Sequence, residues 1–263
     1  MPLVFASICP HPPLIIPTIG GENLKLVDKT VKAMKKMEKK IRKTAPEVIL
    51  IISPHGPLFT DAFCFNLTDK FVTEFKNFGD FSTHLEFIGN LDLAYKIREA
   101  LETKVPTTMI TEPNLDHGAG VPLYYLTPKL KKFSLFPLTY CLLDYQTHFD
   151  FGRHLKEIIT NSPKRIAVIA SGDLSHRLTF DAPAGYSPQG AVFDQKLITL
   201  LKKRATKKIL ELDLNFIEEA GECGLRSILI LLGILENVAY QFQLLSYEGP
   251  FGVGYLVANF RLK

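Results

Sequence analysis

The sequence predicts an α/β fold with a largely parallel central sheet. Apolar runs of strand length alternate with segments of helical periodicity along the whole chain, as in strand–helix–strand units. Residues 48–53, VILIIS, are continuously apolar, which indicates a strand buried on both faces. The chain has 263 residues, 46% of them hydrophobic, enough for a sizeable core. No segment resembles a linker, so we expect a single domain over residues 1–263.

The first part of the chain predicts two strands around one helix. Residues 3–8 are β-branched and apolar and stop at the stiff turn PHPP, which favours a strand. Residues 22–44 place apolar side chains near one stripe and lysines elsewhere, as an amphipathic helix does. The buried strand at 48–53 follows and ends at the turn SPHG.

The remaining elements follow from the same criteria. Short apolar runs that stop at Gly, Pro or Asp predict strands, and apolar residues at helical spacing predict helices. The further expected strands are residues 62–67, 106–110, 134–142, 165–171, 241–247 and 253–260. The further expected helices are residues 91–101, 121–130, 149–159, 189–203, 207–212 and 225–235. Pro122 is tolerated because it falls in the first turn of its expected helix.

Charge and cysteine content exclude several classes of protein. The net charge of +4 is concentrated between residues 25 and 43, where nine basic and two acidic residues give a solvated helix face or an anion-attracting patch. This distribution does not support a nucleic-acid-binding face. Four scattered cysteines without a CxxC motif favour a reducing, cytoplasmic location. No apolar run approaches the ~20 residues of a membrane span, and a homo-oligomer is a possible assembly.

Three histidines share a position at the ends of predicted strands. His11, His55 and His176 each follow an apolar strand by a few residues in a turn rich in Pro or Gly, and His117 lies just before a predicted helix start. Parallel strands bring their carboxyl ends to one edge of a sheet, where ligands of open α/β folds bind. Any one of these histidines alone is more often a polar loop residue. Together they predict a site, and neutral imidazoles suit Zn, Fe, Cu or Ni.

A divalent ion held by imidazoles needs a compensating negative charge. Glu222, in the sequence GECG, is the candidate because the flanking glycines let the backbone approach a site closely. The same residue also fits a helix-start acid that stabilises the first turn of the helix at 225–235. Cys223 is adjacent, and a thiolate ligand in its place makes a softer site that is more typical of Zn or Cu.

Six short motifs are spread over nearly the whole chain. In order, they are PHP, SPHG, LDHG followed by VPL, SGDLSH, GECG and the C-terminal YEGPFG. Their sequence and order resemble those of the class III extradiol ring-cleavage dioxygenases of the catalytic-subunit-B type, and most closely the branch that includes Memo-like proteins. This resemblance implies a three-layer α/β/α fold.

The resemblance also implies roles for single residues. His11 and His55 match the two histidine ligands of a metal, and Glu222 matches the carboxylate ligand. Together they form a two-His, one-carboxylate triad of the kind that holds non-haem Fe(II) for O₂ chemistry. His176 matches the catalytic acid/base, and His117 matches a second histidine near the substrate and oxygen pocket.

Three further residues are candidates for supporting roles at this site. Asp116 and Asp173 are placed to fix imidazole tautomers or to stabilise their own turns. Tyr186 follows the His176 loop and forms either a pocket wall or an exposed loop residue.

Three hypotheses for function remain open at this point. The first is an Fe(II)-dependent dioxygenase that cleaves a small catecholic ring with O₂. The second is a Memo-like protein that binds a metal or ligand without opening a ring. The third is a hydrolase that uses the same residues to hold Zn and activate water.

Overall fold

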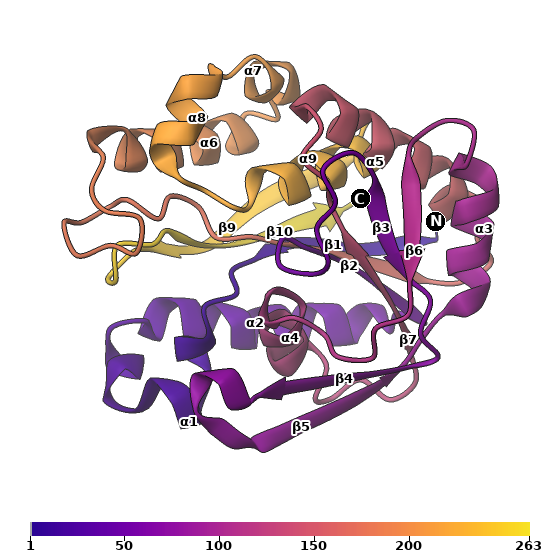
Figure 1. The fold of residues 1–263 in the computed structure, drawn as a ribbon, viewed down its shortest axis with the longest axis horizontal. Helices are drawn as coiled ribbons and strands as arrows, with labels where there is room; N and C mark the ends of the chain where they lie inside the picture. Colours follow the sequence, from indigo (N-terminus) through magenta and orange to yellow (C-terminus); the bar gives the residue numbers. More distant parts are fainter. Residues whose placement is uncertain (1) are drawn as a thin grey trace.

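The computed structural model, which describes residues 2–263, contains a mixed eight-stranded sheet (Figure 1). Its strand order is β6-β3-β7-β2-β8-β1-β10-β9. Strands β7, β2, β8 and β1 are parallel, and β3, β10 and β9 join neighbours in antiparallel pairs. The strands are β1 (Leu3–Cys9), β2 (Val48–Ser53), β3 (Phe63–Asn66), β6 (Thr107–Ile110), β7 (Ser134–Thr139), β8 (Ile166–Ser171), β9 (Tyr240–Glu248) and β10 (Tyr255–Leu262). This confirms the predicted α/β class.

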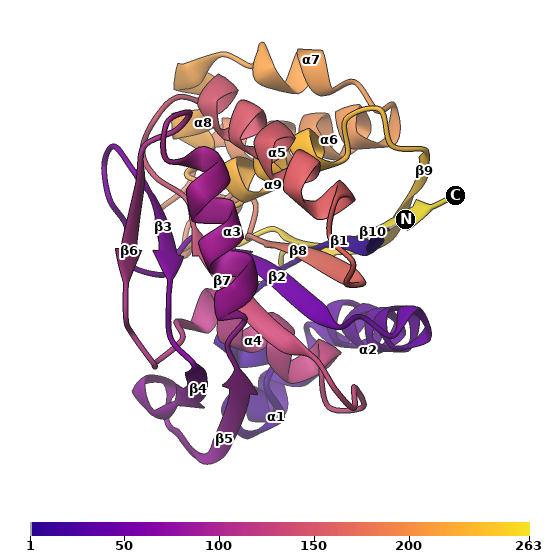
Figure 2. The ribbon, with the colours of Figure 1, turned by 90° about the vertical axis from the view of Figure 1, so that its right-hand side faces the viewer.

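Helices cover both faces of the sheet, as the three-layer expectation requires (Figures 1 and 2). Helices α2 and α4 pack below it, and α3, α5, α6 and α9 pack above it, with α7 and α8 beside α6. The helices are α1 (Pro17–Gly20), α2 (Asp28–Thr44), α3 (Leu91–Leu101), α4 (His117–Leu126), α5 (Tyr145–Thr160), α6 (Pro188–Lys202), α7 (Thr206–Leu210), α8 (Leu214–Ala220) and α9 (Leu225–Ile234). Short 3₁₀ helices occupy Pro13–Ile15, Gly21–Lys25 and Lys76–Phe78.

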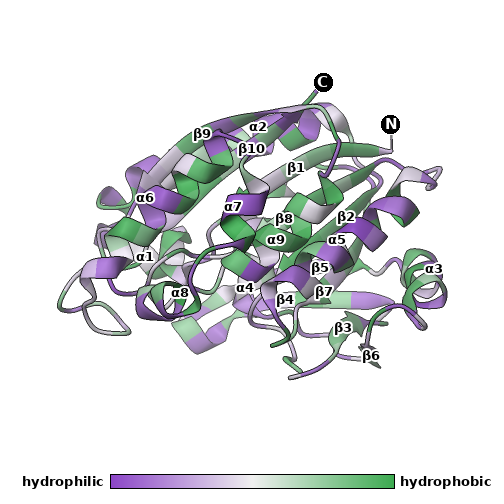
Figure 3. Cartoon of the chain, turned by 90° about the horizontal axis from the view of Figure 1, so that it is seen from above, coloured by the Kyte–Doolittle hydropathy of each residue, from purple (hydrophilic) through white to green (hydrophobic). Residues whose placement is uncertain are grey.

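The central strands are apolar along their length because each contributes to two cores. In β2, Val48, Leu50 and Ile52 belong to the core under α5 and α9, and the two residues between them belong to the core over α2 and α4. Every residue of β2 and of β8 is buried. Figure 3 shows the same pattern, with strands β1 and β8 largely in the hydrophobic colour between their covering helices.

Helix α9 is seated against α5 by backbone contact, and this position matters because its first turn follows the GECG loop. A Cβ at Gly152 of α5 would lie 2.1 Å from the Ile230 carbonyl oxygen, and one at Gly233 would lie 2.1 Å from that of Phe149. Neither glycine tolerates a side chain without separating the helices. The close contact at these two glycines therefore sets the position of α9 and of the loop at 221–224 that precedes it.

The prediction missed a two-stranded sheet, β4 (Lys70–Phe75) with β5 (Asp80–Ile88). Phe71, Thr73 and Phe75 are buried while the residues between them are exposed or half-buried, which is the alternation of a strand with one covered face. Gly79, at φ 84°, makes the turn. That alternation and the glycine were the signals available in the sequence.

Helix starts also differ from prediction, and one helix was missed. Helix α2 begins at Asp28 rather than at residue 22, because residues 21–25 form a 3₁₀ helix. Helix α4 begins at His117 rather than at 121, because the Asp116 carboxylate accepts the Ala119 N–H at 3.1 Å and caps it. Helix α8 was missed, although Asp213 caps it in the same way. Among residues 2–263 no helix combines the length and apolar character needed to cross a membrane.

Candidate metal centre

The four histidines predicted to share a site lie at the carboxyl edge of the sheet. His11 follows β1, His55 follows β2, His176 follows β8, and His117 is the first residue of α4. Because β2, β8 and β1 are adjacent and parallel, their ends deliver three of these residues to the same place. The imidazole rings of His11 and His55 lie 4.8 Å apart, and that of His117 stacks on His55 at 4.4 Å.

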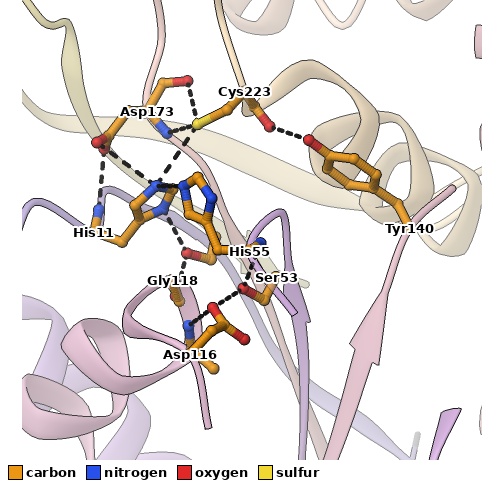
Figure 4. Close-up of polar contacts among 10 residues, drawn as sticks. His11, Ser53, His55, Asp116, Gly118, Tyr140, Asp173 and Cys223 are labelled. Atoms are coloured by element: carbon orange, nitrogen blue, oxygen red, sulfur yellow. Dashed lines mark hydrogen bonds and ion pairs between the residues drawn. The ribbon is translucent and has the colours of Figure 1, made fainter. Parts of the chain in front are cut away.

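Three potential ligand atoms converge at this edge (Figure 4). His11 Nε2 lies 3.0 Å from His55 Nε2 and 3.6 Å from the Sγ of Cys223. All three atoms lie within 4.8 Å of one another. Within the described part of the chain this is the one such group of three or more His, Cys, Asp or Glu ligand atoms. Two imidazoles and a sulfur at these distances form a candidate site for a transition metal.

Glu222, the predicted carboxylate ligand, is engaged elsewhere. Its Oε2 accepts the Leu225 N–H at 2.5 Å, so the carboxylate stabilises the start of α9. Burial raises the pKa of this carboxyl to about 7, against the effects of the Leu225 N–H and the Arg226 charge. Its role as a ligand therefore stays a prediction. The alternative that the sequence left open, Cys223, supplies the third atom of the observed group.

The hydrogen bonds of His11 define which of its ring nitrogens faces the site. Ser171, the last residue of β8, lies 3.0 Å from His11 Nδ1, and its hydroxyl donates to the Gly118 carbonyl. A hydroxyl has one proton, so Ser171 Oγ accepts from His11 Nδ1–H. Nε2 of the neutral ring then carries a free lone pair toward His55 and Cys223, as a metal ligand requires.

A proline in α4 makes this arrangement possible. The Gly118 carbonyl would ordinarily accept the N–H four residues later in the helix, but that residue is Pro122, which has none. The carbonyl is thus available to the Ser171 hydroxyl. Sequence reasoning missed Ser171, although its place at the end of β8 was a signal that it shares the edge with the histidines.

The hydrogen bonds of the two predicted supporting aspartates go to backbone N–H groups and a hydroxyl, and Asp173 Oδ2 also lies 3.7 Å from the ring nitrogen Nε2 of His11. Asp116 Oδ1 accepts the Ser53 hydroxyl at 2.5 Å, and Ser53 Oγ in turn accepts the His55 N–H at 3.3 Å. Asp173 Oδ1 accepts the backbone N–H of His11 at 3.0 Å, and burial raises the pKa of that carboxyl to about 7. Both carboxyls therefore orient the loops that carry the histidines, and neither forms a hydrogen bond to a ring nitrogen.

The imidazoles of the site are held in the neutral form. Burial lowers the pKa of His11 well below its usual value, and the neighbouring His55, His117 and His176 lower it further. Burial is also the largest cause of the lowered pKa values of those three residues. Neutral imidazole is the form that binds metals. The Cys223 thiol has a raised pKa because it is buried beside carboxyls, so metal binding would have to displace its proton.

His176 stands beside the three-atom group without belonging to it. Burial lowers its pKa most, and the nearness of His55 lowers it further because two imidazoles so placed resist taking up protons together. Its Nδ1 is buried and forms no hydrogen bond to residues 2–263. Tyr186, predicted to be either a pocket wall or an exposed loop residue, is 48% exposed and contacts Phe180 of the same loop, with ring centroids 4.5 Å apart.

Comparison with known proteins assigns the chain to a family. The model of the catalytic LigB subunit of aromatic ring-opening dioxygenase matches residues 5–258. The chain therefore belongs to the family of catalytic LigB subunits, which confirms the resemblance of its motifs to the catalytic-subunit-B type, while the Memo-like branch stays a prediction.

Two curated relatives and one solved structure are similar to the chain. Protein CA_C1420 of Clostridium acetobutylicum is 36% identical over 258 residues, which are 94% of this chain and 55% of that protein. The chain thus spans about half the length of this relative. The 3,4-dihydroxyphenylacetate 2,3-dioxygenase of Escherichia coli is 24% identical over 88% of each chain. The crystal structure of the uncharacterized protein JW3007 from Escherichia coli K12 has a TM-score of 0.66 at 17% identity, covers 97% of this chain and 99% of that one, and shares its fold.

Proposed function

We propose that this chain is an Fe(II)-dependent extradiol-type dioxygenase that opens the ring of a small catecholic substrate with O₂. The observation that carries the proposal is the convergence of His11, His55 and Cys223 beside two further neutral histidines, in a member of the ring-opening family. The name of the E. coli relative, which specifies a 3,4-dihydroxyphenyl compound, supports a catecholic substrate.

The residues present fit a divalent metal. His11 Nε2 offers a lone pair because Ser171 occupies Nδ1, and His55 Nε2 faces it at 3.0 Å. Cys223 would add the compensating negative charge as a thiolate. When bound, Fe(II) would supply binding of the catecholate and O₂ and transfer of electrons between them. With one thiolate and two neutral imidazoles, a divalent ion keeps a net charge of +1, which favours an anionic substrate.

The neighbouring histidines supply the proton chemistry. Because its pKa is lowered, the His176 imidazole is neutral at pH 7 and accepts a proton from a catechol hydroxyl as the substrate binds. His117, stacked on His55, is also neutral and presents its ring to the same space. The burial of His11, which is 2% exposed, keeps water from one side of the site.

Cys223 favours a second candidate function, a Memo-like metal-binding protein that does not open a ring. Thiolate is a soft ligand that suits Zn(II) or Cu(I) better than a carboxylate does. In that case the same three residues hold a metal, and the histidines nearby serve ligand binding alone. Zn is therefore the alternative metal, and a homo-oligomer and a cytoplasmic location stay predictions.

The test is oxygen consumption by the Fe(II)-loaded protein with a panel of catechols under reducing conditions. The dioxygenase proposal predicts O₂ uptake with a coloured ring-opened product, absent from His11→Ala. It also predicts that His176→Ala keeps the metal and loses activity by about 10²–10⁴-fold. Retained metal without O₂ uptake across the panel would instead support the second candidate. Activity that survives without O₂ and with Zn would indicate a hydrolase.

A further inference from the structure

The segment at residues 247–254, YEGPFGVG, has no part in the metal centre, yet it packs against the loop that carries His176 (Figure 1). The backbone N–H groups of Leu174 and Leu178 donate to carbonyls of this segment at 2.8 and 3.0 Å. The turn between β9 and β10 therefore holds the chain on both sides of His176.

Asp194 of α6 joins this segment to the His176 loop. It is 0% exposed, its Oδ1 accepts the Ser175 N–H at 2.9 Å, and its Oδ2 accepts the Tyr247 hydroxyl at 2.6 Å. Gly254 leaves room for the carboxylate, since a Cβ there would lie 2.1 Å from Asp194 Oδ2. A buried carboxylate is costly unless it is hydrogen-bonded, and these two donors satisfy it.

The backbone connects Asp194 to His176, because Ser175, whose N–H Asp194 accepts, directly precedes His176 in the chain. A peptide unit is planar, so fixing the Ser175 N–H fixes the orientation of the 174–175 peptide, from which the chain continues into His176. The ring nitrogen Nδ1 has no hydrogen bond to any described residue. Its position thus depends on the backbone around it.

A second set of bonds ties the same loop to the residues before Cys223. The His176 N–H lies 3.2 Å from the Ala220 carbonyl oxygen, which also accepts the Ser175 hydroxyl at 2.7 Å. Ser175 therefore bonds to Asp194 through its N–H and to the segment before Cys223 through its hydroxyl.

We propose that Asp194, held by the Tyr247 hydroxyl, is a positioning residue that orients the 174–175 peptide and through it the imidazole of His176. The catalytic consequence rests on the proposed dioxygenase function, whereas the positioning itself does not.

The kinetic arm compares two substitutions of one residue. Asp194→Ala leaves the Ser175 N–H without its acceptor, and we expect kcat to fall by about 10–100-fold, as for a misplaced catalytic group, with metal content and KM for catechol unchanged. Asp194→Asn keeps an acceptor oxygen and should recover kcat to within about fivefold of the wild type. A general loss of packing would not distinguish these two variants in this way.

The second arm does not need turnover. The side-chain resonances of His176, assigned by their loss in His176→Gln, are recorded in full-length ¹⁵N-histidine-labelled protein loaded with diamagnetic Zn(II). Asp194→Ala should shift them and Asp194→Asn should largely restore them. The matched control is Asn90→Ala, which also removes a buried side chain bonded to one backbone N–H and one hydroxyl, far along the chain at α3.

A second pair of variants covers the case in which Asp194→Ala does not fold. Tyr247→Phe should shift the His176 resonances, whereas Tyr240→Phe, which removes a hydroxyl from the start of the same strand, should not. Unchanged His176 resonances in Asp194→Ala and Tyr247→Phe would overturn the positioning proposal. An inactive wild type with shifted resonances in these variants would overturn the proposed function alone.

Discussion

The histidines at the sheet edge and His84 on the β4–β5 sheet differ in what surrounds them. His11 is 2% exposed, and burial and other imidazoles lower its pKa. His84 is exposed, with its Nδ1 2.9 Å from Glu74 and its Nε2 3.3 Å from Glu86, and these carboxylates raise its pKa. The same residue type is thus a neutral ligand candidate in one region and, in the other, a surface imidazole whose charged form is favoured. Burial and neighbouring charge decide which.

The largest expected effect is loss of metal from Cys223→Ala. Removing one of three ligand atoms should weaken metal binding by more than the roughly 10–100-fold that loss of a supporting group alone costs. Metal content after anaerobic purification and dialysis, measured by mass spectrometry, tests this. Cys64→Ala, which removes a buried free cysteine outside the site, is the control and should keep its metal.

Glu222→Gln decides between the two candidate third ligands. If Cys223 is the ligand, this variant keeps the metal and loses only part of the stability of the α9 start. Metal lost from Glu222→Gln and kept by Cys223→Ala would restore the carboxylate triad predicted from the sequence.

At His148 the effect of burial on a histidine pKa can be measured without a contribution from other imidazoles. It is 0% exposed, both ring nitrogens lie close to backbone carbonyls, and burial lowers its pKa to about 4. Between pH 6.5 and 4 the unfolded chain takes up a proton there that the folded chain does not. This residue alone should thus lower the free energy of unfolding by about 3 kcal/mol as the pH falls through that range.

Urea unfolding at pH 7 and pH 4.5 measures how much free energy of unfolding is lost on acidification. His148→Gln should lose less stability on acidification than the wild type, whereas Gln146→Ala on the same helix should follow the wild type. Parallel curves for all three proteins would mean that His148 is not held neutral.

Ser171→Ala tests the tautomer of His11. Without the hydroxyl, His11 Nδ1–H has no acceptor, so the ring is free to present either nitrogen. We expect metal affinity to fall by about 10–100-fold, measured by competition with a chelator. Ser227→Ala, which removes another buried hydroxyl, should leave the affinity unchanged. Equal affinities in both variants would contradict this role for Ser171.

The smallest effect concerns His84. Substituting Glu74 and Glu86 together by Gln should move its titration midpoint in NMR down toward that of an ordinary histidine. Since its folded pKa is raised, any stability it adds is present below pH 6.5 and is lost as the pH rises through that folded pKa. Glu99→Gln on α3 should leave the midpoint in place. A midpoint that does not move would mean that these carboxylates do not set the pKa of His84, and the contrast with the buried histidines of the sheet edge would be lost.

Much of the fold was predictable from local pattern. Strands at 48–53 and 166–171 were visible as continuous apolar runs, because strands covered on both faces need apolar side chains everywhere. The β4–β5 sheet was missed because its strands are covered on one face and its exposed positions resemble loop sequence. Helix α4 was placed four residues late because the cap at Asp116 outweighs the position of Pro122.

The candidate site was predicted less evenly. The four histidines could be grouped from sequence because each lies beside a strand end or a helix start, and the ends of parallel strands share an edge. The choice between Glu222 and Cys223 could not be made, since adjacent side chains point in different directions and only the backbone path decides which one faces the histidines. Ser171 could not be assigned to His11, because their contact joins residues 160 positions apart.

The sequence by itself determined the residue types, the α/β class, the strands of the central sheet and the gathering of histidines at one edge of it. These depend on periodicity and on the geometry of parallel strands, which act locally. Only the tertiary structure decided that the Cys223 sulfur rather than the Glu222 carboxylate lies beside His11, and which nitrogen of that ring faces it. Those outcomes depend on how the start of α9 and the end of β8 pack against β1, and distances between such distant segments arise only when the chain is folded.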